Sequence, residues 1–582
     1  MNKYVIVSGG TGSMCARTIV FLLAAMKAKK GMDGRLYIRV VDMDKKSDAS
    51  AACKKLIEDY ESLRKQTNVA SNGGLKLPDI VMDVWDFTDA VKKKVEKSGI
   101  KLSEEAALSL KTFFLSENHD KKNAMLLNTF FDAEEQNANL DKGFYGHPNI
   151  GSVVFNLVKD SFLERDSGED KSEFMLNFYS DLKKCKDEEK VPVYLFGSLF
   201  GGTGASVIPN MIDILQSITD PEKEQSSWGN KLRIGAAMMM PYFKLPDKKN
   251  EEGEGLSPDY IKFFSQTKAA LQYYGEFKIA DKLESLLLLG QEELCNTSEV
   301  FSSGEKQYQH FHILLLAAAA AALRFFDRKL GQGVLMWKVP WKEEVTPAWE
   351  TLFANDMDLR EEEDMLQKFF RFSVVVSEYM RCRYTVSVVN DKPLHEQLKT
   401  DETVRATCYH MAQVKPTKKF TGVYAPLTDK QLDDFYKNPV NSAVRFCRDF
   451  IHFYFDCAVS GYDWSKYHVK NEEGFPIACK ASEYLAGMNE RMVDLLNIEK
   501  ADKLIDGQLS SADVDKLMLN SYFDYQPLNR ERQKLSFKDS TVGSLFERQV
   551  KKLVKKNKYN GEAAFAQIYV SCYDAAIELQ DK

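Results

Sequence analysis

The sequence predicts an α/β protein whose N-terminal part is a parallel sheet flanked by helices. The stretch 191–215 has the pattern of a buried apolar strand, a glycine turn and a helix from Val207, and the same succession occurs at residues 4–26, with a helix from Met14. Further apolar, β-rich runs occur at 36–41, 232–240 and 283–290. Such continuous runs are typical of strands that are buried on both faces of a parallel sheet.

The length of 582 residues indicates about two to four domains. We expect an α/β domain at 1–308 with a helical insertion at about 50–140, a long central helix at 309–330, and a mainly helical C-terminal domain with some strand at 331–582. The central helix is apolar almost all round, as is typical of a helix buried within a large protein.

Composition excludes several classes of protein. The net charge of −6 argues against a broad nucleic-acid-binding surface, so no nucleic-acid partner is predicted. The 10 cysteines are scattered without a CxxC pair, which is typical of a reduced, cytoplasmic protein. The N-terminus begins directly with a strand pattern rather than a signal peptide, and the longest apolar run, 313–323, is too short to span a bilayer. We therefore expect a cytoplasmic protein with no membrane partner.

Three glycine-rich segments offer backbone N–H groups at predicted helix starts, where anions such as phosphate bind. The candidate binding residues in these segments are Gly9, Gly10, Thr11, Gly12, Ser13, Gly146, His147, Asn149, Gly201, Gly202, Thr203, Gly204, Ala205 and Ser206. The alternative is that the glycines serve only tight turns that need positive φ angles. For His147, the alternative is a solvated loop histidine.

Asp42 and Asp44 follow the second predicted strand. A carboxylate at this position holds a ribose in Rossmann-type sheets, and the alternative is a solvated strand end. An NAD(P)-binding oxidoreductase would use residues 4–17 together with Asp42. That hypothesis leaves the second glycine segment, 197–206, unexplained.

The order of these features resembles the tubulin/FtsZ superfamily, and most of all its divergent, large prokaryotic members. GSLFGGTGAS at 197–206 is similar to the family's GGGTG(S/T)G signature. SGGTGSMCAR at 8–17 is similar to its first phosphate loop, and GFYGHPNIG at 143–151 to its third. The resemblance covers residues 1 to about 330 and implies a self-assembling GTPase that binds GTP or GDP with Mg²⁺.

The resemblance also implies roles for single residues. Asp42 and Asp44 would hold Mg²⁺ through water, and Gln291, near the position of the family's asparagine, would contact a purine base. Hydrolysis would use acids from the loop 331–344, inserted into the site of a neighbouring subunit, with Glu343 and Glu344 as the catalytic candidates. The alternative for these two residues is a solvated helix start.

A third hypothesis is a non-enzymatic scaffold in which the nucleotide is structural. The helical C-terminal region would then bind a protein partner or a second copy, in a prokaryotic filament or a multi-protein defence system. The self-assembling GTPase is the favoured hypothesis, with the scaffold and the oxidoreductase as alternatives. Nothing in the residues decides between a filament and a defence role.

Overall fold

The computed structural model describes residues 1–28, 30–43, 48–68, 75–97, 108–114, 121–140, 143–144, 146–163, 172–186, 189–220, 223–244, 260–291, 295–296, 311–339 and single positions within 362–373 and 442–457. Asp44, Glu343 and Glu344 lie outside them, as does most of the predicted C-terminal domain. The expected domain boundaries stay a prediction.

The core of the fold is a seven-stranded sheet with the order β11-β9-β7-β4-β1-β2-β3. Every neighbouring pair of strands is parallel. The strands are β1 (Lys3–Ser8), β2 (Leu36–Asp42), β3 (Ile80–Asp86), β4 (Val191–Ser198), β7 (Leu232–Met239), β9 (Ser285–Gln291) and β11 (Gly333–Val339). The predicted α/β class with a parallel sheet is confirmed.

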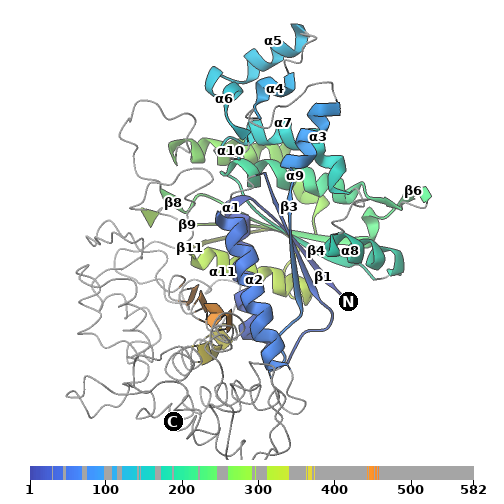
Figure 1. Cartoon of the computed structure of the whole chain (residues 1–582), viewed down its shortest axis with the longest axis vertical. Helices are drawn as coiled ribbons and strands as arrows, with labels where there is room; N and C mark the ends of the chain where they lie inside the picture. Colours follow the sequence, from blue (N-terminus) through green and yellow to red (C-terminus); the bar gives the residue numbers. More distant parts are fainter. Residues whose placement is uncertain are drawn as a thin grey trace, which may run out of the picture. The chain divides into compact units, whose positions relative to one another are not determined.

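Helices cover both faces of this sheet (Figure 1). The helices are α1 (Gly9–Lys27), α2 (Asp48–Thr67), α3 (Thr88–Lys97), α4 (Leu110–Phe114), α5 (Lys121–Phe130), α6 (Ala133–Asn137), α7 (Pro148–Val158), α8 (Glu173–Lys184), α9 (Gly202–Gln216), α10 (Tyr260–Glu276) and α11 (Ile313–Phe326). Side chains of α7, α8 and α9 share one apolar cluster with the sheet. On the opposite face, Phe325 of α11 packs on Tyr194 of β4, with 5.2 Å between ring centroids.

Two short strand pairs lie outside the main sheet. One is antiparallel, between β5 (Thr219–Asp220) and β6 (Lys223–Ser227), in the segment that follows α9. The other is parallel, between β8 (Phe243–Lys244) and β10 (Cys295–Asn296), which follow β7 and β9 along the chain.

The structure differs from the sequence-based expectation in two strands. The predicted helical insertion at about 50–140 contains β3, which forms one edge of the sheet. Residues 333–339, expected within a loop, form β11 at the other edge. Helix α11 therefore connects two adjacent parallel strands, β9 and β11, as a crossover within this sheet.

The chain divides into two compact units, the first made of residues 1–19, 33–54 and 80–341 and the second of 20–32, 55–79 and 342–582. The described core of the second unit is aromatic. Phe21 stacks on Phe453 with 4.9 Å between centroids, and Tyr60 lies 5.3 Å from Phe446. Arg445 donates hydrogen bonds of 2.7 and 3.0 Å to the two carboxylate oxygens of the buried Asp59.

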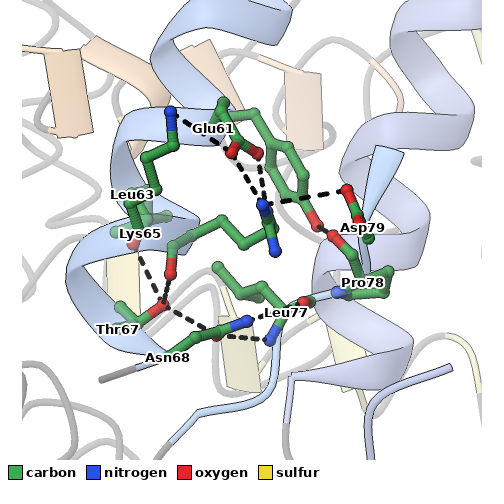
Figure 2. A network of polar contacts seen from close by, with 10 residues as sticks. Glu61, Leu63, Lys65, Thr67, Asn68, Leu77, Pro78 and Asp79 are labelled. Atoms are coloured by element: carbon green, nitrogen blue, oxygen red, sulfur yellow. Dashed lines mark hydrogen bonds and ion pairs between the residues drawn. The ribbon is translucent and has the colours of Figure 1, made fainter. Parts of the chain in front are cut away.

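A polar network joins the end of α2 to the segment before β3 (Figure 2). Arg64 donates to both carboxylate oxygens of Glu61, at 2.6 and 2.7 Å. The Asn68 side chain bonds the backbone N–H and C=O of Leu77, at 3.0 and 3.1 Å. The Tyr60 hydroxyl donates to the Pro78 carbonyl, at 2.6 Å. These contacts are all internal, so we assign the network a structural role in holding the end of α2 against the segment before β3.

One described helix, α1, is long and apolar enough to cross a membrane by length and composition alone. However, 78% of its most apolar window is buried inside the molecule. Within the described residues, α1 is therefore a core helix of the fold.

Candidate functional site

The sheet order places a topological switch point between β1 and β4. From β1 the chain proceeds through β2 to β3, and from β4 it proceeds the opposite way through β7 and β9 to β11. In open parallel sheets, ligands bind outside the carboxyl ends of the strands at such a switch point. The two glycine segments predicted from the sequence follow these two strands.

Both glycine segments form the first turn of a helix rather than a separate loop. Helix α1 begins at Gly9, and α9 begins at Gly202. Neither helix has an acidic residue in its first turn. Gly9 has a φ angle of +71°, which side chains rarely adopt, so glycine is required where the chain turns from β1 into α1. The first backbone N–H groups of both helices therefore lie at the switch point.

The two glycine segments touch each other. The Ser8 hydroxyl donates to the Thr203 carbonyl at 3.3 Å. A β-carbon placed on Gly9 would lie 3.2 Å from the Thr203 Cβ and 3.3 Å from the Gly204 nitrogen. Glycine therefore allows a close approach that a larger residue would oppose.

The third glycine segment packs against the second. A β-carbon on Gly202 would lie 2.8 Å from the Phe144 Cβ and 3.2 Å from the backbone nitrogens of Gly146 and His147. A β-carbon on Gly151 would overlap the Ser206 hydroxyl. The Gly146 carbonyl is held by Gln266 of α10, whose amide donates to it at 2.6 Å. All three predicted segments are therefore brought together at one edge of the sheet.

His147 is a buried residue, not a solvated one, with 7% of its surface exposed. Its Nδ1 lies 2.9 Å from a carboxylate oxygen of Glu135, and the Asn149 amide donates to the same oxygen at 3.0 Å. Glu135 is also buried. The sequence analysis missed Glu135, because it lies in the five-residue α6 and belongs to no binding motif. Its only local signal is the capping-box spacing from Asp132.

Two equivalent serines in the glycine helices differ in their partners. Ser206, the fifth residue of α9, donates its hydroxyl to the Gly202 carbonyl at 2.7 Å. A hydroxyl has a single hydrogen, so this bond removes Ser206 as a side-chain donor to a ligand. Ser13, the fifth residue of α1, is fully buried, and its hydroxyl has no hydrogen-bond partner among the described residues. Of the two serines, Ser13 is therefore the one whose hydroxyl hydrogen is not used in a bond to another described residue.

Asp42 ends β2, the neighbour of β1, at the same edge of the sheet. One carboxylate oxygen accepts the Met43 N–H at 2.9 Å, and the residue is 4% exposed. No group of three or more His, Cys, Asp or Glu side chains suited to a metal occurs among the described residues.

Gln291 and His312 lie at the carboxyl ends of the strands beyond β4. Gln291 ends β9, and its amide donates to the Tyr242 carbonyl at 2.7 Å. The Tyr242 ring lies 5.0 Å from the ring of His312, which caps α11 by accepting the Leu314 N–H at its Nδ1. Burial lowers the pKa of His312 to about 3, so its imidazole is neutral at physiological pH. Strand β7 separates Gln291 from β4.

Thiol chemistry is disfavoured near the glycine helices. Cys15 of α1 and Cys53 of α2 are buried. Burial raises the pKa of the Cys15 thiol, and it raises that of Cys53 to about 12. Because the thiolate is the nucleophile, neither cysteine is suited to covalent catalysis.

Comparison of the chain with protein-family models, curated proteins and solved structures finds no match.

Proposed function

We propose that this chain is a tubulin/FtsZ-like protein that binds a guanine nucleotide with Mg²⁺ at the switch point between β1 and β4. The phosphates would accept hydrogen bonds from the first N–H groups of α1 and α9 and from the start of α7. Gly9 and Gly202 keep side chains out of the contacts between the segments, and Gly146 has a φ angle of +76°. Asp42 would hold water on Mg²⁺, and Gln291 would contact the base.

The observation that carries this proposal is the contact between the three glycine segments. A single glycine turn is explained by a backbone that needs a positive φ angle. Three glycine-bearing segments from distant parts of the chain, two of them at the switch point, are better explained by one shared anionic ligand. None of the three helices α1, α7 and α9 has an acidic residue in its own first turn.

The same contact weighs against the NAD(P)-binding alternative. A dinucleotide fingerprint places its pyrophosphate on one G-x-G-x-x-G turn. Here Gly10 and Gly12 are followed by Cys15 at the third position. The second and third segments, around Gly202 and Gly146, have no role in that fingerprint.

Hydrolysis would depend on assembly of the chain into a homo-oligomer or filament. Gly333 pairs with Ser285 at the start of β9, so the end of α11 lies near the amino ends of the strands, whereas the glycine segments lie at the carboxyl ends. The exposed Asp327, the C-cap of α11, therefore lies at the amino ends. In a head-to-tail assembly this carboxylate would face the glycine segments of the neighbouring copy, so Asp327 is a candidate acid for hydrolysis.

Analysis of the nucleotide that co-purifies with the protein tests the ligand class. After acid denaturation and anion-exchange chromatography, we expect GTP or GDP. NAD(P) in the extract would contradict the tubulin/FtsZ-like proposal and favour the oxidoreductase.

A sedimentation assay tests the assembly. Pelleting that requires Mg²⁺–GTP, with a specific GTPase rate that rises with protein concentration, would support the self-assembling enzyme. Tight binding with no turnover at any concentration would favour the scaffold. Turnover in the Asp327→Ala variant at the wild-type rate would exclude Asp327 as the acid that completes the site.

A further inference from the structure

The carboxylate of Glu135 is fixed by three hydrogen-bond donors. One oxygen accepts the Asp132 backbone N–H at 3.1 Å. The other accepts Nδ1 of His147 at 2.9 Å and the Asn149 amide at 3.0 Å. The Asp132 side chain in turn accepts the Glu135 N–H at 2.8 Å, which completes a capping box at the start of α6. Glu135 is therefore held rigidly against α7.

This contact determines which ring nitrogen of His147 carries hydrogen. A carboxylate only accepts hydrogen bonds, so Nδ1 of His147 must be the donor. A neutral His147 ring then has its hydrogen on Nδ1 and its lone pair on Nε2. An Nδ1 that carries hydrogen cannot accept a backbone N–H.

His312 shows the other arrangement, in which Nδ1 of an N-cap histidine accepts a hydrogen bond. It precedes α11 as His147 precedes α7, and both are the N-cap residues of their helices. The Nδ1 of His312 accepts the Leu314 N–H at 3.1 Å and caps α11. The side chain of His147 makes no cap bond to α7.

We propose that Glu135 is a positioning residue of the nucleotide site. By accepting the Nδ1–H of His147 in a hydrogen bond, it keeps this histidine from capping α7. The first N–H groups of α7, which begin at Asn149 because Pro148 has none, are then left open to phosphate. Helix α7 is the one whose start, at His147, lies against Gly202. This inference rests on the proposed nucleotide-binding function. It assigns to Glu135, a residue of α6, the role of preventing His147 from capping α7.

Replacement of Glu135 by methionine tests the inference, because it removes the acceptor and keeps a long, helix-favouring side chain. Glu134→Met is the matched control, since Glu134 is an exposed neighbour on the same helix. Circular dichroism and thermal unfolding establish that both variants fold. Glu135→Gln retains one oxygen acceptor and should restore much of the wild-type behaviour.

Two readouts are measured. In ¹⁵N spectra, with the ring signals of His147 assigned by their loss in His147→Asn, we expect Nδ1–H in the wild type and Nε2–H in Glu135→Met. In titration calorimetry with Mg²⁺–GTP, we expect binding about tenfold weaker in Glu135→Met, because one helix start is capped, and unchanged in Glu134→Met.

Failure of this inference can be distinguished from failure of the proposed function. If the wild type and Glu135→Met bind Mg²⁺–GTP equally, or His147 keeps Nδ1–H in Glu135→Met, Glu135 is not a positioning residue and the nucleotide site stands. If the wild type binds no nucleotide, both proposals are overturned.

Discussion

The two strand–glycine–helix units at the switch point, β1–α1 and β4–α9, have similar sequences, but they differ in the hydrogen bonding of their serines and in the packing of their glycines. In α9, the Ser206 hydroxyl closes on the Gly202 carbonyl, and Gly204 allows the helix to approach its own strand at Ser198. In α1, the Ser13 hydroxyl makes no such bond within the described residues, and Gly12 allows close packing on Val7.

The difference indicates a division of tasks between the two units. The α9 unit satisfies the hydroxyl of Ser206 within its own helix. In the α1 unit, the buried Ser13 hydroxyl has no partner among the described residues, and a buried polar group without a partner costs about 1–3 kcal/mol. Under the proposed function, a phosphate of the nucleotide would accept this hydroxyl.

The largest effect is expected where the second and third segments meet. Gly202→Ala places a methyl group 2.8 Å from the Phe144 Cβ. Overpacking of this kind costs about 1–3 kcal/mol, so Mg²⁺–GTP should bind roughly 10- to 100-fold more weakly. The measurement is titration calorimetry on the purified variant.

Gly275→Ala is the matched control for that variant. A β-carbon on Gly275, in α10, would meet no atom within 4 Å. It should bind as the wild type does. Equal binding by Gly202→Ala would mean that this glycine serves only the turn.

A smaller effect should separate the two serines. Ser13→Ala removes a hydroxyl donor to a charged ligand, so Mg²⁺–GTP should bind about tenfold more weakly. Ser206→Ala removes only a bond within α9, so its affinity should stay within about twofold of wild type. Calorimetry on both variants gives the contrast, and the reverse order of affinities would refute the division of tasks.

The smallest effect is expected in the pH dependence of stability, through His312, the N-cap residue of α11. The folded pKa of His312, about 3, lies below its ordinary value of 6.5. The unfolded chain therefore binds the proton first, and stability is lost as the pH falls from about 6.5 towards 3. His312→Asn retains a capping oxygen without this titration.

Thermal unfolding midpoints at pH 7 and pH 5 test that prediction. The burial of neutral His312 should cost the wild type about 1–2 kcal/mol more than His312→Asn over this interval, which corresponds to about 1–2 degrees in the midpoint for a chain of this length. Equal shifts in the two proteins would show that His312 does not titrate with unfolding.

The central strands were predictable from the sequence, and the edge strands were not. β4 and β7 are buried along their whole length, so they appear as continuous apolar runs. β3 is only partly buried and contains Asp83, and β11 exposes Val334 and Met336. An edge strand packs on fewer neighbours, so its sequence is under weaker apolar constraint and resembles other segments.

The candidate site was predictable at its glycines and not at its supporting residues. Gly9, Gly146 and Gly202 stand in recognisable segments, and these meet in the structure. Glu135 and Gln266 support the third segment from other helices. Contacts between residues distant in sequence leave no local pattern, so only the fold reveals them.

Hydrogen–deuterium exchange with and without Mg²⁺–GTP tests the central claim most directly. One nucleotide shared by three segments predicts simultaneous protection of residues 9–13, 146–151 and 201–206, with the same dependence on ligand concentration. Protection of the first segment alone, or of none of the three while GTP is bound, would contradict the account.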